Sequence, residues 1–155
     1  MLLALIAGVP ILLAILLRVN SLYLFLSISV GYLLSTSIGE TTALTVRTFA
    51  SNSQPELVTN LILFALPIVL CLILMRKSMP RKQLPIQLVP LFGNGLLILV
   101  LSIPMMTAGT RGAILSSPIG DPLYQATDII VAVVAVIHFL LMLATGKPHD
   151  KKKKH

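Results

Sequence analysis

The segment LVTNLILFALPIVLCLILM, residues 57–75, is followed directly by the basic stretch RKSMPRKQ, residues 76–83. A helix needs roughly 17 to 25 apolar residues to cross the hydrocarbon core of a bilayer, and residues 57–75 carry no charge. Lys and Arg placed directly after such a segment are typical of the cytoplasmic end of a membrane-spanning helix. This part of the chain therefore predicts an all-α membrane protein, a polytopic helix bundle.

The composition of the whole chain agrees with this prediction. Of its 155 residues, 56% are hydrophobic and only 11% are charged, whereas about 25% of the residues of a soluble domain are charged. The net charge is +7, but the basic residues form short clusters between apolar runs. Trp is absent and aromatic residues make up 5% of the chain, so there is no platform on which bases could stack. We therefore expect no nucleic acid partner.

The apolar segments predict five membrane-spanning helices within one domain, residues 1–146. The five spans are residues 2–17, 22–38, 57–75, 84–106 and 129–145. The first of them lacks the basic start and the cleavage site of a signal peptide, so we expect it to be retained. The alternative is a first segment that does not cross the membrane, which would leave four spans and a cytoplasmic N-terminus.

The basic residues also predict an orientation. Five spans with the C-terminus inside the cell and the N-terminus outside place ten of the twelve Lys and Arg residues on the cytoplasmic side. Only Arg47 and Arg111 then lie outside. An excess of Lys and Arg in cytoplasmic loops is the pattern that membrane insertion favours.

Two longer connections are expected on the outer side. Residues 39–56 contain Leu44, Val46 and Phe49, which are too sparse for a span but suit a short helix on the membrane surface. A plain loop is the alternative. Residues 107–127 are rich in Gly, Ser and Pro, so we expect an irregular exposed loop there.

Small residues mark the surfaces where helices should pack closely. Because lipid provides no hydrophobic drive for helix association, membrane helices approach each other through such residues. In the second span they recur every four residues on one face: Ser27, Gly31, Ser35 and Gly39. Their partner is either another span of the same chain, which we favour, or a second copy. In the fourth span, Gly93 and Gly95 flank Asn94 and should let a neighbouring helix come close.

The fifth span carries polar residues that are costly in a bilayer and normally point into the bundle. Asp128, Ala132, Ala135, His138 and Met142 share one helical face, which we predict to be directed inward. His138 lies near the middle of the membrane and is the candidate for a proton relay or a pore lining. The alternative is a neutral histidine that forms a hydrogen bond between helices.

Three amides and one carboxylate complete the polar residues of the spans. Gln87 and Asn94 lie seven residues apart on nearly one face, where we expect them to bond to a neighbouring helix. Glu56 and Asn60 lie one turn apart at the start of the third span. The charge of Glu56 suits a helix N-terminus, and the alternative is a cation site that it shares with Asp128.

The last residues, 147–155, form a basic tail that we expect in the cytoplasm. Lysines next to a membrane are attracted to anionic lipid headgroups by about 1 kcal/mol each. An acidic protein partner is the alternative. The residues of this predicted headgroup site are Lys147, Lys151, Lys152, Lys153 and Lys154.

Sequence signatures of enzymes are missing from the chain. It has no GxSxG, HExxH or phosphate-binding loop motif. Two of its three histidines, His149 and His155, lie in the tail. We therefore predict no catalytic residues, no metal site and no cofactor.

The order of features between residues 18 and 106 resembles the colicin V production protein family. Arg18 precedes a span rich in small residues, Pro55 and Glu56 open the next span, and LFGNGLL, residues 91–97, lies in the following one. The resemblance implies a small bacterial inner-membrane protein associated with the cell envelope, without catalytic residues to carry over. The family usually has Arg-Gly where this chain has Arg18-Val19, and a fifth span with a lysine tail is not expected of it.

These features favour a non-enzymatic integral membrane protein that acts as a scaffold or subunit of a membrane assembly. Its partners would be anionic lipids and either a larger membrane protein or further copies of itself. The alternative function is an oligomeric channel, pore or small transporter. The brevity of the loops favours the plasma (inner) membrane of a prokaryote.

Overall fold

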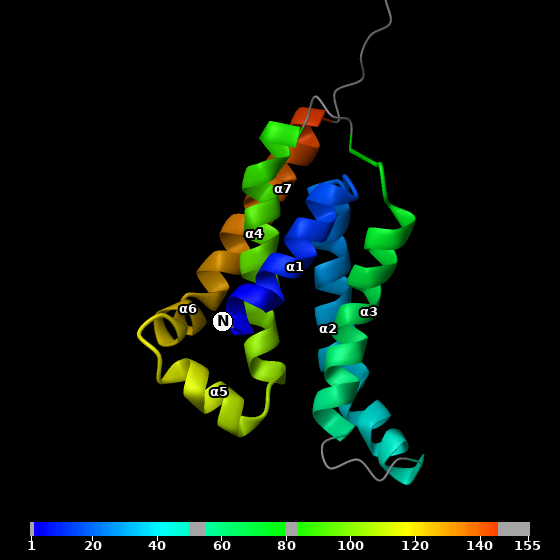
Figure 1. Cartoon of the computed structure of the whole chain (residues 1–155), viewed down its shortest axis with the longest axis vertical. Coiled ribbons are helices and arrows are strands. Elements are labelled where there is room, and N and C mark those ends of the chain that lie inside the picture. Colours follow the sequence, from blue (N-terminus) through cyan, green and yellow to red (C-terminus); the bar gives the residue numbers. More distant parts are fainter. Residues whose placement is uncertain (1, 50–54, 80–83, 146–155) are drawn as a thin grey trace, which may run out of the picture.

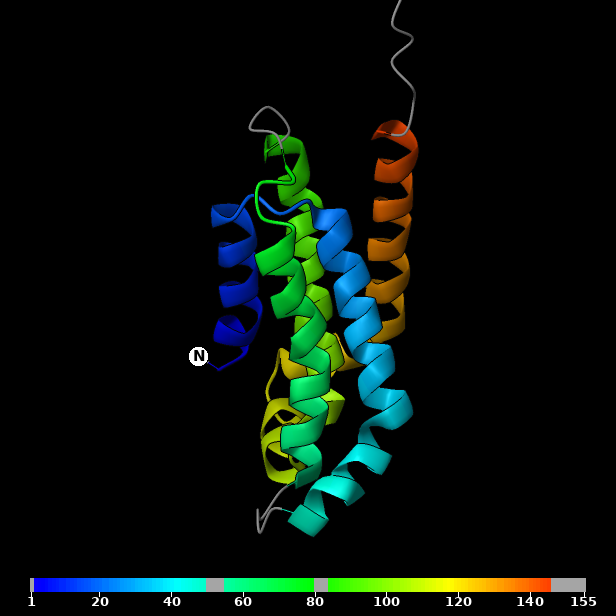
Figure 2. The same ribbon diagram turned by 90° about the vertical axis from the view of Figure 1, so that its right-hand side faces the viewer.

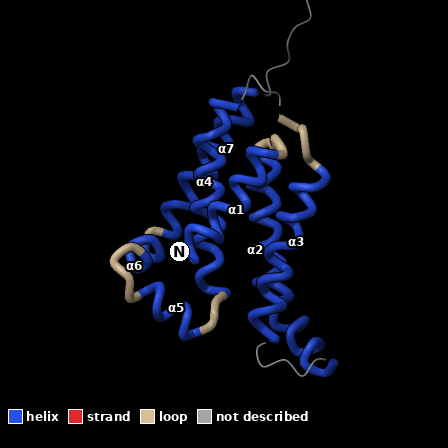
Figure 3. The backbone as a smooth tube through the Cα atoms, viewed as in Figure 1, coloured by secondary structure: helices blue, strands red, loops and turns tan. Residues whose placement is uncertain are grey.

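The computed structural model describes residues 2–49, 55–79 and 84–145, and the side chains of residues 8–45, 57–79 and 85–144. Within these ranges the chain is all-helical, with no strand (Figure 3). The helices form a bundle (Figure 1), and a short 3-10 turn, η2, follows α4. The elements are α1 (Leu2–Leu16), α2 (Ser21–Phe49), α3 (Pro55–Leu74), α4 (Leu84–Ser102), η2 (Ile103–Met105), α5 (Ala108–Leu115), α6 (Gly120–Gln125) and α7 (Thr127–Thr145).

Among the described residues, four helices have the length and composition of membrane-spanning segments, as expected of a helical membrane protein. They are Ser21–Thr45 of α2, Leu57–Leu74 of α3, Pro85–Met105, which covers most of α4 with η2, and Thr127–Ala144 of α7. Helix α1 has 15 residues and is therefore only about 22 Å long. That the segment of α1, residues 2–17, crosses the membrane as well stays a prediction.

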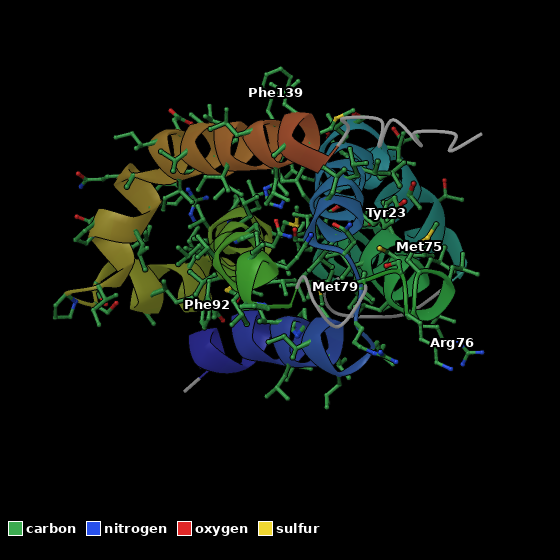
Figure 4. The ribbon with its side chains drawn as sticks, turned by 90° about the horizontal axis from the view of Figure 1, so that it is seen from above. Tyr23, Met75, Arg76, Met79, Phe92 and Phe139 are labelled. Carbon is green, nitrogen blue, oxygen red and sulfur yellow. The ribbon has the colours of Figure 1, made fainter. Side chains whose placement is uncertain are left out.

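Helix α4 is the centre of the bundle. Seen from above, it lies between α1 on one side and α7 on the other, and it also packs against α2, which in turn packs against α3 (Figure 4). Its residues Leu91, Leu97 and Val100 are almost completely buried. By contrast with these buried side chains of α4, Phe139 of α7 points away from the bundle and is 61% exposed (Figure 4). Such outward apolar side chains suit contact with lipid.

One end of the bundle, which we call the loop end, holds residues 17–20 and 75–79. Arg18, two residues after the end of α1, adopts the left-handed conformation (φ 53). The bonds Val19 N→Ala14 O (2.9 Å) and Arg18 N→Ile15 O (3.1 Å) close the last turn of this helix, as in a Schellman cap. Backbone bonds Lys77 N→Leu17 O (2.7 Å) and Met79 N→Arg18 O (2.9 Å) tie the two segments together.

The small residues of α2 lie at its contact with α3. A Cβ atom added to Gly31 would overlap the carbonyl oxygen of Phe64, and one added to Gly39 would overlap Oδ1 of Asn60. Both glycines therefore bring their Cα hydrogens close to an oxygen of α3, a contact that recurs between closely packed helices. Ser35 is buried between them, whereas Ser27 is half-buried. The stripe of small residues is thus used within the chain.

For residues 39–49 the prediction of a loop or separate surface helix is wrong, because α2 continues without a break to Phe49. Residues 50–54 lie outside the described part of the chain. No Gly or Pro follows Gly39 until Pro55, and threonine hydroxyls are satisfied within the helix, as in Thr42 Oγ1→Ile38 O (2.8 Å). Such back-bonding tends to bend helices. Figure 2 shows the last turns of α2 leaning away from the direction of its first part.

The prediction of an irregular loop in residues 107–127 is also wrong, because α5 and α6 lie there. Thr107 caps α5 by accepting a bond from Thr110 N (3.4 Å). Arg111 joins the two short helices, since its Nη2 donates to the Tyr124 hydroxyl (2.9 Å) and its guanidinium lies over the same ring. Both helices lie at the end of the bundle opposite the loop end (Figure 1). We call it the α5–α6 end.

We predict that Gly31→Ala lowers the free energy of unfolding by about 1–3 kcal/mol, because the new methyl group overfills the α2–α3 contact. Chemical unfolding in detergent micelles measures this. Gly8→Ala is the control, because a Cβ there meets nothing within 4 Å. Loss of an oligomer from Gly31→Ala without loss of stability would contradict packing within one chain.

Candidate functional site

The first turn of α2 is buried inside the bundle. Val19 and Ser21 are both 0% exposed. The first N–H groups of a helix have no partner within the helix, and complete burial keeps water away from them. Oxygen atoms from other parts of the chain must therefore reach this turn.

Gln87 of α4 supplies such an oxygen to Ser21. Its Oε1 accepts hydrogen bonds from Ser21 N (3.0 Å) and from the Ser21 hydroxyl (2.7 Å). The next N–H group, of Leu22, donates to Oδ1 of Asn20 (3.0 Å). Gln87 is 1% exposed, so a side chain of one membrane helix caps the start of another in a dry environment.

Asn94 makes the second connection between α4 and Ser21. Its Nδ2 donates to the carbonyl oxygen of Ser21 (2.8 Å), and the side chain is fully buried. Gln87 and Asn94 lie two helical turns apart, so both can reach the same residue. The backbone N–H, the hydroxyl and the carbonyl of Ser21 are thus all engaged by α4.

His138 brings α7 into the same cluster. Its Nδ1 lies 2.8 Å from the carbonyl oxygen of Val134. A carbonyl can only accept, so Nδ1 carries the hydrogen and Nε2 of the neutral ring holds a lone pair. The imidazole lies beside the backbone carbonyl of Ser21 and stacks on Phe25 of α2, with ring centres 4.6 Å apart. We call Ser21, Gln87, Asn94 and His138 the polar junction.

The polar junction has unused hydrogen-bonding capacity. Among the described residues, no partner is found for Gln87 Nε2, Asn94 Oδ1 or His138 Nε2. Leaving a buried polar atom unpaired costs about 1–3 kcal/mol. Asn60 Oδ1 is in the same position within the described part of the chain, but it rests against Gly39.

Two cavities run along α2 from the α5–α6 end toward Phe25. The first, of about 390 Å³, lies between α2, α3 and η2 and is lined by Glu40, Asn60 and Thr36 among others. The second, of about 510 Å³, lies between α2, α4 and α7 and is lined by Asp128 and Phe25 among others. Tyr32, Ser29 and Thr36 belong to one stripe of α2, which reads Phe25, Ser29, Tyr32, Thr36, Glu40.

A third cavity, of about 690 Å³, is apolar and lies between α1, α3 and α4. Val9, Leu61 and Ile98 are typical of its lining. His138 lines none of these three cavities. Phe25, which lines the second cavity, covers its ring instead.

The predicted inward face of α7 is correct at His138 but wrong at most of its other positions. Asp128, Ala132 and Met142 are exposed, and the buried positions are Val134 and His138. The helix is rotated because Val134 packs against Gly93 of α4, where an added Cβ would lie 3.1 Å from its Cγ2. Asp128 is placed at the second cavity rather than beside His138.

Some of the other predicted residues lie apart from the polar junction, and the rest lie outside the described residues. Gly95 of α4 is buried, and Asn60 lies at the α2–α3 contact. The side chain of Glu56 and the lysines of the tail, 147–155, lie outside the described residues. The proposed pairing of Glu56 with Asp128 is therefore untested.

Sequence reasoning missed Ser21, Phe25 and the polar stripe of α2. The stripe was visible as spacings of four, three, four and four residues from Phe25 to Glu40. The small residues Ser27, Gly31, Ser35 and Gly39 mark the neighbouring face of the same helix and are the stronger signal in the sequence. Ser21 had a weaker signal, a small hydroxyl residue directly after Asn20 at the start of an apolar run.

Comparison with known proteins adds no relative. No protein-family model, no curated protein and no solved structure matches this chain significantly. Within the described residues, no group of three or more His, Cys, Asp or Glu side chains is placed to hold a metal ion.

We predict that Gln87→Leu lowers the free energy of unfolding by about 1–3 kcal/mol, the cost of leaving the buried Ser21 N–H without an acceptor. Gln125→Leu is the matched control, because Gln125 is exposed and bonds only locally to Asp121 (2.8 Å). Its effect should stay within about 0.5 kcal/mol.

Unfolding of both variants in micelles gives the comparison. An unchanged free energy of unfolding in Gln87→Leu would show that Gln87 does not act as the cap of α2. A double-mutant cycle with Ser21→Ala isolates the second bond, from the Ser21 hydroxyl to Gln87 Oε1.

Proposed function

We propose that this protein is a non-enzymatic scaffold or subunit of a membrane assembly. The polar junction is the observation that supports this proposal most. The buried polar side chains described in α4 and α7 are Gln87, Asn94, Ser102 and His138. All of them except Ser102 are directed at the first turns of α2. Polar groups used in this way join helices.

Helix α7 is the element that a partner reaches most easily. Of the four candidate spans, it is the least covered by the rest of the chain. Its exposed apolar side chains include Val133, Val136 and Leu140, which lie on one face at helical spacing. Lipid covers this face in the absence of a partner.

The proposed setting is the plasma (inner) membrane of a prokaryote, with five spans, the N-terminus outside and the C-terminus inside. The loop end would then face the cytoplasm, and the lysines of the tail would contact anionic headgroups. The resemblance of residues 18–106 to the colicin V production family supports an envelope-associated role of this kind.

The alternative proposal is an oligomeric channel or small transporter. The two cavities along the polar stripe of α2 favour it, because polar side chains in a span normally face the bundle or a wet cavity. Glu40 and Asp128 place a carboxylate at each cavity. Several copies would be needed to enclose a full water path.

We expect native mass measurement in nanodiscs, after mild isolation from the source membrane, to find this chain bound to a larger membrane protein. Val136→Phe on α7 should reduce the amount of that partner bound to the chain. Ile62→Phe on the exposed face of α3 should leave this amount unchanged. A closed ring of copies without another protein would favour the channel, and a lone chain would contradict both proposals.

We expect a reporter fused after His155 to be active only in the cytoplasm, because ten of the twelve basic residues lie on that side in the proposed orientation. A second fusion before Leu2 should report the outside. Reporters on the same side would favour four spans and would show that α1 does not cross.

A further inference from the structure

The neutral imidazole of His138 can accept one proton, at Nε2. The hydrogen on Nδ1 is fixed by the carbonyl of Val134, so the lone pair of Nε2 is the free site of the neutral ring. Nε2 has no hydrogen-bond partner among the described residues. The neighbouring group is the backbone carbonyl of Ser21, which is an acceptor. A protonated Nε2 can donate to that carbonyl oxygen, whereas the lone pair of the neutral ring cannot.

A route from the α5–α6 end leads toward this site. The polar stripe of α2 runs from Glu40 to Phe25, about 22 Å along the helix. Tyr32 lines both the cavity that contains Glu40 and the cavity that contains Asp128. The inner end of the second cavity is Phe25, and the same ring stacks on His138.

The charges along this route are two carboxylates. Helix α4 has no ionisable side chain between Leu84 and Ser102. On α6, Asp121 accepts a bond from Gln125 and the Tyr124 hydroxyl accepts one from Arg111. On α2 the ionisable groups are Tyr23, Tyr32, Glu40 and Arg47, and on α7 the only acidic one is Asp128.

We propose that His138 is a proton-binding site reached from the α5–α6 end through the two cavities, with Phe25 as the side chain that closes the route. The proton comes from water in the cavity and binds to the lone pair of Nε2. The new N–H donates to the Ser21 carbonyl, and the reverse step returns the proton to water. No further bond forms or breaks.

The consequence is a change at the polar junction. Ser21 O accepts a hydrogen bond from Asn94 Nδ2 (2.8 Å), and the protonated imidazole adds a second, charged donor to the same oxygen. The contact of α7 with α2 becomes stronger when the pH at the α5–α6 end falls. This inference is independent of the scaffold role, because the site exists or fails in the chain alone.

The test uses the full chain in liposomes, with His149→Gln and His155→Gln so that His138 is the only imidazole. Insertion in one direction is checked by protease cleavage at Arg76, which is exposed at the loop end (Figure 4). The nitrogen NMR signal of Nε2 reports its protonation. Lowering the pH from about 8 to 5 at the α5–α6 end should protonate Nε2, and the same step at the loop end should leave it neutral at first.

Three variants test the route. Phe25→Ala should make proton uptake several-fold faster, and Ser29→Leu, which fills the cavity next to Phe25, should slow it. Phe139→Ala is the control, because Phe139 points away from the bundle (Figure 4).

A ring that stays neutral down to pH 5 from both sides, or that protonates first from the loop end, would overturn the proton site. Equal rates for Phe25→Ala and Phe139→Ala would overturn the role of Phe25.

Discussion

The bundle depends on one constraint, the burial of the start of α2 in a medium without water. An N–H group in the first turn of a helix has no partner within that helix, and here neither can it bond to solvent. Gln87 provides the missing acceptor from α4. The position of α4 relative to α2 is therefore fixed by hydrogen bonds of defined direction, whereas apolar contact alone would let the helices slide.

The same constraint explains why α4 is central. A helix that caps another from within the bundle must lie beside it along two turns, as the bonds from Gln87 and Asn94 to Ser21 require. Helix α7 then packs against α4 through Val134 and Gly93. His138 meets Ser21 as a result of that packing. One residue of α2 thus gathers polar groups from two other helices.

The sequence was sufficient for the class of fold, because uncharged apolar runs such as residues 57–75 have few other solutions. It was also sufficient to mark Gln87, Asn94 and His138 as polar groups inside the spans. It was not sufficient to identify Ser21 as their common partner, because no local pattern distinguishes Ser21 from the other serines of the chain. The rotation of α7 was predicted from Asp128, which lies close enough to the helix start to be exposed. Packing of Val134 on a glycine decided the rotation, and periodicity does not contain that information.

Arg18 and Lys77 have a further consequence at the loop end. Both adopt left-handed backbone conformations, with φ of 53 and 64, which glycine adopts more easily than any other residue. In the proposed orientation both are basic residues of cytoplasmic connections, and such residues direct insertion. Glycine would relieve the backbone strain but remove a positive charge. In the proposed orientation, the backbone conformation and the direction of insertion therefore favour different residues at these two positions. The chain retains the charge and carries the local strain.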